Sequence, residues 1–150
     1  MQRLLIAIRI ARSAADLGLA SVAVFAEDNA QVPHTRACDQ ALPLRGLGPA
    51  PCLDAEQLVA AALDSGCDAV HPGYGLFSEN ADFARRCAAA GLVFVGPDAA
   101  TLDAFGDKAQ ALALAQASGV PVMNGTAHAT TRDGAHAFFA RLGSGAGMMI

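Results

Sequence analysis

Lysine is almost missing from this sequence of 150 residues, because Lys108 is the only one and arginine supplies every other basic side chain. The arginines are scattered along the chain, the formal net charge is −4 and the isoelectric point is near 5.4. Proteins that bind nucleic acid usually carry a basic patch. We therefore expect no nucleic acid partner.

Long apolar runs are also missing. Apolar residues make up 53% of the chain and the mean hydropathy is +0.35, but the apolar residues occur in short segments broken by charges. A membrane-spanning helix needs about 20 consecutive apolar residues. The N-terminal run becomes charged again at Arg9, too early for a signal-peptide core. These absences predict a cytoplasmic protein with no membrane partner.

Metal-ligand spacing is absent as well. No pair of cysteines has the spacing C-x-x-C, and the histidines do not cluster. The residues concerned are Cys38, Cys52, Cys67, Cys87, His34, His71, His128 and His136. We expect reduced cysteines that serve in packing and no metal site.

Short apolar runs alternate with helical periods through the first hundred residues. We expect buried strands at Arg3–Ile8 and Ser21–Ala26, joined by a helix at Arg9–Leu17 that Gly18 ends. Further strands are expected at Gln40–Leu44, Asp68–Val70 and Leu92–Val95, with helices at Asp54–Ser65 (Asp54 as cap, Gly66 as stop) and Asn80–Ala90 (Gly91 as stop). This alternation predicts an α/β fold with a doubly wound, mostly parallel sheet covered on both faces.

The pattern changes after Asp98. Two helices are expected, at Ala99–Phe105 and Asp107–Ser118. They are followed by a short strand at Pro121–Met123, a polar loop at Asn124–Thr131, a helix at Arg132–Leu142 and a strand at Met148–Ile150. A chain of this length is expected to form one domain and a piece of a second.

The run His71-Pro-Gly-Tyr-Gly-Leu-Phe-Ser-Glu-Asn80 connects a predicted strand to a predicted helix. Its proline and two glycines interrupt regular structure, and Ser78 is placed to cap the helix. A tight turn alone would explain the glycines and the proline. The remaining side chains can form hydrogen bonds, and loops that follow strands in α/β sheets often bind ligands. Both a structural and a functional role fit this spacing.

Three motifs give the sequence a family resemblance. The stretch HPGYGLFSENADFA, then GLVFVGP at 91–97 and GDKAQA at 106–111, closely resembles the N-terminal domain of biotin carboxylase in acetyl-CoA, propionyl-CoA and pyruvate carboxylases. The resemblance implies a Rossmann-like domain at residues 1–118 and the incomplete start of an ATP-grasp domain at 119–150. The family's lysine and glycine-rich loop for the phosphates would follow Ile150.

The resemblance also implies roles for single residues. Lys108 lies in the GDK motif, whose lysine contacts ATP in the family, although by composition alone it fits a solvated lysine near a helix N-terminus. His71, Tyr74, Glu79 and Asn80 are expected to support an interface between domains. No catalytic residue is expected in this chain, and neither P-loop nor dinucleotide-binding spacing is found.

The family's cofactors and partners follow from the same resemblance. The full-length enzymes use ATP and Mg²⁺ and carboxylate biotin, but none of these is expected to bind tightly to this chain. Expected partners are the remaining biotin carboxylase domains, the biotin carboxyl carrier and the carboxyltransferase, with a homo-oligomer as a further possibility.

One departure from the family concerns the N-terminus. The family opens approximately as LIANRGEIAxRI, whereas this chain reads Leu5-Ile-Ala-Ile-Arg-Ile10, so the loop between first strand and first helix is absent. Such connections normally take about 2–6 residues. We expect that Ile8–Ile10 is strained or that the helix loses its first turn.

The functional alternatives belong to different classes. The first is the N-terminal part of a biotin carboxylase that is inactive by itself. The second is a noncatalytic interaction module or gene remnant that associates with carboxylase subunits or with itself. A stand-alone nucleotide-binding domain would need a phosphate loop that the sequence does not contain.

Overall fold

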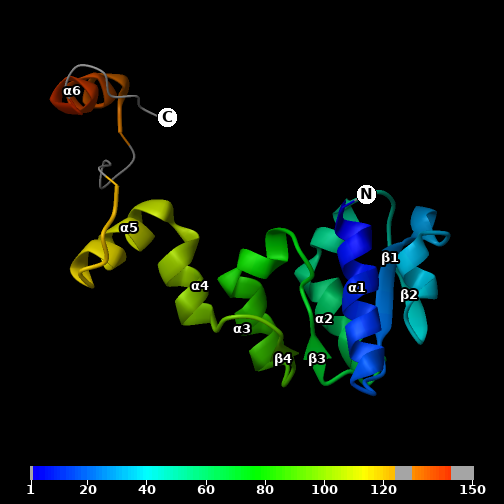
Figure 1. The fold of residues 1–150 in the computed structure, drawn as a ribbon. Coiled ribbons are helices and arrows are strands. Elements are labelled where there is room, and N and C mark those ends of the chain that lie inside the picture. The colour runs from blue at the N-terminus through cyan, green and yellow to red at the C-terminus, as the bar shows by residue number, and fades with distance from the viewer. Residues whose placement is uncertain (1, 124–129, 143–150) are drawn as a thin grey trace. The chain divides into compact units, whose positions relative to one another are not determined.

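The computed structural model describes residues 2–123 and 130–142. The chain divides into two compact units, Met1–Asp103 and Ala104–Ile150. The first unit is an α/β structure with small parallel sheets, and the described part of the second is helical (Figure 1). The predicted α/β class is therefore confirmed for the first unit.

The first element is helix α1, Gln2–Asp16, and not a strand followed by a helix. The predicted strand at Arg3–Ile8 is wrong, because the helix runs through it. The predicted strain at Ile8–Ile10 and its alternative, a helix that loses its first turn, are also wrong, since the helix is continuous and every described residue with positive φ is a glycine. The helix ends before Gly18, whose φ is +69°. This end agrees with the predicted stop.

The helix is continuous because no helix-breaking residue separates the predicted strand from the predicted helix. No glycine or proline occurs between Gln2 and Leu17, and alanine, leucine, glutamine and arginine are good helix formers. Extending an existing helix adds one hydrogen bond for each residue fixed, while starting a helix is unfavourable. Ala11 is buried on the inner face of α1 and Ala7, Ile10 and Ala14 are half-buried. Without a loop, the helix therefore propagates back through the apolar segment.

In the described part of the chain, four short strands form two separate parallel pairs. β1 (Val22–Ala26) pairs with β2 (Gln40–Leu44), and β3 (Ala69–Val70) pairs with β4 (Val93–Phe94). The strand positions agree with the prediction, but a single doubly wound sheet is not formed. The strands appear in the order β2, β1, β3, β4 across the view of Figure 1.

Helices α2 (Ala55–Asp64) and α3 (Ala81–Ala89) have the predicted starts and stops. Asp54 caps α2, because its Oδ1 accepts the amide of Gln57 at 3.0 Å. Gly66 and Gly91 follow the two helices with φ of +69° and +77°. A residue without a Cβ adopts this left-handed conformation at little cost, which explains why the glycines mark both ends.

The core of the first unit lies where α2, α3 and the second strand pair meet. Phe83, Cys87 and Leu92 are buried, and Leu58, Val59 and Phe94 pack around them among other half-buried apolar residues. The rings of Phe83 and Phe94 meet in a T-shaped contact with centroids 6.1 Å apart. These contacts fix α3 against β4 and so position the segment that precedes α3.

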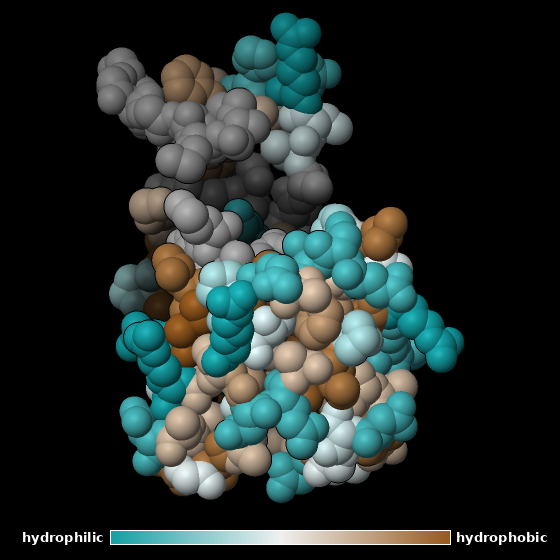
Figure 2. All heavy atoms as spheres, turned by 90° about the vertical axis from the view of Figure 1, so that its right-hand side faces the viewer, coloured by the Kyte–Doolittle hydropathy of each residue, from teal (hydrophilic) through white to brown (hydrophobic). Residues whose placement is uncertain are grey.

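Four short 3-10 turns connect the larger elements: η1 (Glu27–Asn29), η2 (Pro33–Arg36), η3 (Ala50–Leu53) and η4 (Leu76–Glu79). Helix α1 packs on η2, and β1 contacts both η2 and η3. Figure 2 shows the side of the molecule on which β2 lies. Hydrophilic and hydrophobic residues are interspersed there, without one continuous apolar patch.

The remaining helices are α4 (Ala99–Gly106), α5 (Lys108–Ala117) and α6 (Arg132–Leu142), all close to their predicted bounds. The predicted strand at Pro121–Met123 is wrong, because these residues form no regular structure. The segment is only three residues long and one of them is proline, so its strand signal is weak. No described strand pairs with it. Most of the predicted loop at Asn124–Thr131, and the strand at Met148–Ile150, lie outside the described residues.

Candidate functional site: a clamped strand-to-helix loop

The segment from His71 to Asn80 leads from β3 to α3 and contains η4. Its first half turns at Gly73, whose φ is +69° and whose amide donates to Nδ1 of His71 at 3.0 Å. Its second half is closed by Ser78, whose hydroxyl donates to the carbonyl of Gly75 at 2.6 Å. Both halves of the loop are therefore held by hydrogen bonds within the loop.

Phe77 anchors this loop in the core. Its ring lies 4.4 Å from the Phe83 ring, measured between centroids, with the two planes tilted by 32°. Phe83 is 2% exposed. Aromatic pairs in such contact contribute about 0.5–1.5 kcal/mol beyond the apolar area that they bury. The loop is thus fixed by packing as well as by hydrogen bonds.

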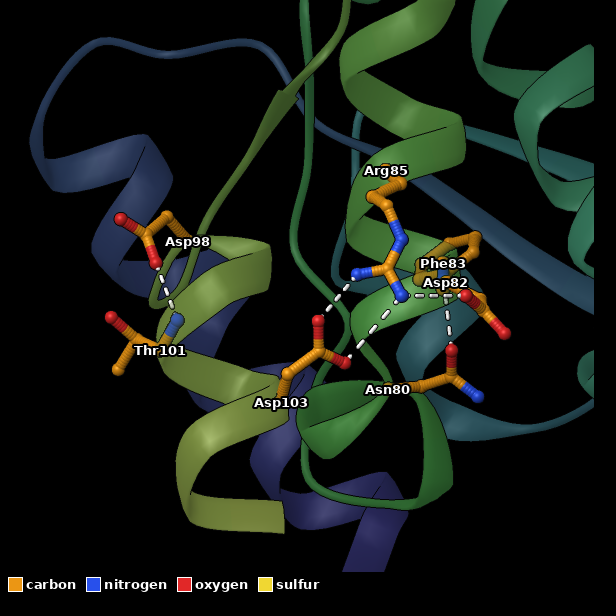
Figure 3. A network of polar contacts seen from close by, with 7 residues as sticks. All are labelled: Asn80, Asp82, Phe83, Arg85, Asp98, Thr101 and Asp103. Atoms are coloured by element: carbon orange, nitrogen blue, oxygen red, sulfur yellow. Dashed lines mark hydrogen bonds and ion pairs between the residues drawn. The ribbon is translucent and has the colours of Figure 1, made fainter. Parts of the chain in front are cut away.

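Asn80 joins the loop to α3 as the helix cap. Its Oδ1 accepts the amide of Phe83 at 2.8 Å (Figure 3). The sequence predicted Ser78 as the cap, and this is wrong because the helix begins at Ala81 and the Ser78 hydroxyl is engaged within η4. Asn80 has the extended backbone, φ −100° and ψ 104°, that is typical of a cap.

Replacement of Asn80 by alanine is expected to lower the free energy of unfolding by about 1 kcal/mol, because the amide of Phe83 loses its acceptor. Asn80→Ser is the matched control, since serine can accept the same hydrogen bond. Chemical denaturation of both variants measures the difference. Equal midpoints for Asn80→Ala and the parent chain would show that the cap does not stabilise the domain.

The other predicted loop residues face solvent. Tyr74 is 64% exposed, and His71 and Glu79 are also exposed. The loop therefore brings His71, Tyr74, Glu79 and Asn80 into one short segment, with Asn80 turned to the helix and the other three available for contact. A large aromatic side chain on a rigid, exposed loop is typical of residues that bind a partner.

A network of exposed charges continues from this loop along α3 to α4 (Figure 3). Arg85 donates to Oδ1 of Asp82 at 2.9 Å and to Oδ2 of Asp103 at 2.8 Å. Asp98 accepts the amide of Thr101 at 2.7 Å, and this hydrogen bond holds the pKa of Asp98 below its usual value. Exposed ion pairs each contribute about 0–1 kcal/mol. The pair with Asp103 joins α3 to the first residues of α4 within the first unit.

Lys108 lies in the second unit, at the first position of α5, and its side chain is exposed. Asp107 caps this helix, because its Oδ1 accepts the amides of Ala109 at 2.8 Å and Gln110 at 3.0 Å. Those amides are the groups that would otherwise bind a phosphate at a helix N-terminus. With a carboxylate in that place, α5 by itself offers one cation and no phosphate cradle.

Within residues 2–123 and 130–142, no group of three or more His, Cys, Asp or Glu residues could hold a metal ion. Over the same ranges, no helix is long and apolar enough to cross a membrane. All four cysteines are free, but Cys52 is exposed, so the predicted packing role does not hold for it.

Three contacts in and near the first unit's loop could not be predicted from the sequence. The Phe77 anchor and the ion pair between Arg85 and Asp103 join residues whose proximity depends on the fold. The third is His34, whose Nε2 lies 3.1 Å from the carbonyl oxygen of Val24 while its Nδ1 is buried without a partner. A single histidine in a polar turn has no spacing that would have revealed this contact.

Curated proteins with related sequences include several carboxylases. The chain is 44% identical to mitochondrial pyruvate carboxylase of Rattus norvegicus over 123 residues, which cover 81% of this chain and 10% of that protein. It is 43% identical to the biotin-dependent acyl-coenzyme A carboxylase alpha3 subunit of Mycobacterium leprae over 122 residues, 81% of this chain and 20% of that subunit. The chain thus spans a tenth to a fifth of these relatives.

Solved structures similar to this chain also include carboxylases. The biotin carboxylase domain of a single-chain bacterial carboxylase matches with a TM-score of 0.86 and 53% identity, over 91% of this chain and 32% of that one. The multifunctional pyruvate carboxylase from Rhizobium etli matches with a TM-score of 0.72 and 39% identity, over 79% of this chain and 12% of that one.

The family model described as "Biotin carboxylase, N-terminal domain" matches residues 1–102. This range coincides with the first compact unit, which ends at Asp103. It also contains the clamped loop with the motif HPGYG and the strand β4 with its following Gly96-Pro97. From the matched range, the relatives and the fold, the chain belongs to the biotin carboxylase N-terminal domain family.

Proposed function

We propose that this chain supplies the N-terminal part of a biotin carboxylase, the component that carboxylates biotin with ATP and bicarbonate in biotin-dependent carboxylases. The observation that supports this most directly is the family match over residues 1–102, together with relatives such as pyruvate carboxylase and an acyl-coenzyme A carboxylase subunit. Residues 119–150 are proposed to begin an ATP-grasp domain. The domain boundary near residue 118 remains a prediction.

Within that enzyme, the chain is proposed to act as a scaffold. Phosphoryl transfer depends on positioning and on charges that stabilise the transferred group. ATP and Mg²⁺ would supply the activation of bicarbonate when bound. Among the described residues, the exposed Lys108 is the one predicted ATP contact, and the amides beside it are occupied by Asp107. The groups that perform the chemistry are therefore proposed to belong to other parts of the enzyme.

The loop from His71 to Asn80 is the proposed docking surface for those parts. Phe77 and Asn80 hold the loop from inside, while Tyr74 projects with 64% of its surface exposed. Ordering a flexible loop at an interface costs free energy, and a loop that is already clamped avoids most of that cost. The partner proposed for this surface is the remainder of the biotin carboxylase, with the carboxyl carrier and carboxyltransferase as further components of the assembly.

ATP binding to the isolated chain is expected to be weak, with a Kd of about 1 mM or higher, because a single exposed cation provides little of the charge that a triphosphate needs. Lys108→Ala is expected to change this Kd by less than about threefold. Lys108→Arg, which keeps the charge, is the control. Isothermal titration calorimetry with Mg·ATP measures both values. Micromolar binding that Lys108→Ala abolishes would show that a phosphate site exists in this chain.

A further inference from the structure

We call the edge of β1 away from β2 and the edge of β3 away from β4 the inner edges of the two strand pairs; among the described residues, neither has a strand partner. In a parallel pair, alternate residues of a strand direct their backbone groups to opposite sides. The carbonyl of Ser21 accepts the amide of Gln40, so the odd-numbered residues of β1 bond to β2, and Val22, Val24 and Ala26 face away from it. Likewise Asp68 and Val70 accept amides from the β4 side, which leaves Ala69 facing away.

These inner edges differ from the outer edge of β2. Pro43 lies there, opposite Phe25 in the register, and removes a donor on the side away from β1. Proline on an edge strand is a common protection against the addition of another strand. The inner edge of β1 has no proline, and Ala69 of β3 is exposed. The edges beside β1 and β3 are therefore able to accept a strand.

His34 covers part of the β1 edge in an unfavourable way. Its Nε2 contacts the carbonyl of Val24 at 3.1 Å, whereas its Nδ1 is buried and has no hydrogen-bond partner. A buried polar atom without a partner is destabilising. A strand amide could replace His34 at the Val24 carbonyl and release the ring, so the present contact does not close this edge firmly.

The segment Leu4–Ile8 has the composition of the absent strand. It is five apolar residues long, as β1 and β2 are five residues long, and the sequence predicts a strand there. In the structure it forms the start of α1, where Leu5 is 64% exposed and Ile6, Ala7 and Ile8 are only half-buried. Among the residues of α1 whose burial is described, the buried one is Ala11, which lies beyond this segment. Ile6, Ala7 and Ile8 can therefore leave the helix without removing a fully buried side chain from the core.

The number of residues between this segment and the rest of α1 determines whether the segment can pair with β1 of its own chain or only with β1 of another copy. A strand that fills the place beside β1 of its own chain must reverse direction before α1 begins, and such connections take about 2–6 residues. No residue separates Ile8 from the helical segment that starts at Arg9. A strand that extends away from the helix without a turn needs no such reversal, and it can pair with a second copy. Short hinges of this kind favour the exchange of segments between copies.

We propose that two copies of this chain exchange their N-terminal segments, with Leu4–Ile8 of each copy forming a strand between β1 and β3 of the other. The interface is isologous, so one dimer contains two identical exchanges. The exchange completes one sheet from the two strand pairs in each copy. It is independent of ATP and biotin, and it goes beyond the scaffold role proposed above.

The dimer is tested with the full chain by light scattering across a range of concentrations, combined with hydrogen exchange. The dimer fraction is expected to rise with concentration, and the amides of Val22 and Val24 to become protected with it. The amides of Ala23 and Phe25, which face β2, are the internal control because they are bonded in both states. A chain that remains monomeric, or a dimer in which Val22 and Val24 exchange as in the monomer, would overturn the proposal.

Two variants identify the exchanged segment. Ile6→Asp is expected to raise the dimer dissociation constant by about a hundredfold or more, because each exchange would bury an unpaired carboxylate. Ser13→Asp adds the same charge at an exposed position of α1 outside the segment and is the matched control. Insertion of Gly-Asn-Gly-Ser between Ile8 and Arg9 is expected to give a monomer with Val24 protected, since the strand then reaches its own sheet. Dimers that persist in the Ile6→Asp or the insertion variant would contradict the exchange.

Discussion

Replacement of Phe83 by alanine is expected to lower the free energy of unfolding of the first unit by about 3–5 kcal/mol, the usual loss for a large aromatic removed from a core. Phe83 is 2% exposed and contacts both Phe77 of the loop and Phe94 of β4. Its removal leaves a cavity between α3, the loop and the second strand pair. Domains of this size have a total stability of about 5–15 kcal/mol, so the loss is a large fraction of it.

Phe105→Ala is the matched control for this experiment. It removes the same atoms from a side chain that is 61% exposed, and its effect is expected to stay within about 0.5 kcal/mol. Urea denaturation followed by circular dichroism measures both variants. A loss of less than 1 kcal/mol for Phe83→Ala would mean that the core is not centred on α3, and that the loop is not anchored as described.

Isolated chain is expected to show no ATP hydrolysis that depends on bicarbonate and biotin. Loss of a single group that stabilises the transition state typically lowers kcat by about 10²–10³, and here the metal ligands and the phosphate loop are all proposed to lie elsewhere. The measurement is phosphate release with and without bicarbonate and biotin. A related biotin carboxylase domain assayed in parallel is the positive control. Turnover by this chain that requires both substrates would contradict the scaffold role.

Much of the first unit could be predicted because its signals are local. The helix from Ala55 begins at a capping aspartate and ends before Gly66, and both events involve neighbours in sequence. Strands β1 and β2 are short apolar runs between polar turns, and they occur where expected. The HPGYG loop was also identified from its glycines and proline, although its cap proved to be Asn80 and not Ser78.

The failures have a common physical origin in tertiary context. Leu4–Ile8 has a strand composition, but a strand needs partners and a connection, whereas helix propagation needs only the absence of a breaking residue. The ion pair between Arg85 and Asp103 joins side chains 18 positions apart, and no periodicity links them. His34 reaches Val24 only after η2 has packed beside β1. Lys108 as an ATP contact rests on family resemblance and stays a prediction.

Reconstitution of activity tests whether this chain is a scaffold for catalytic parts supplied elsewhere. Bicarbonate-dependent ATP hydrolysis is measured for this chain, for a biotin carboxylase remainder that lacks its own N-terminal part, and for their mixture. We expect activity in the mixture alone, and Tyr74→Ala should raise the chain concentration needed for half-maximal activity while Leu63→Ala, exposed on α2, leaves it unchanged. Activity of this chain by itself, or a mixture as inactive as its components, would contradict the scaffold role.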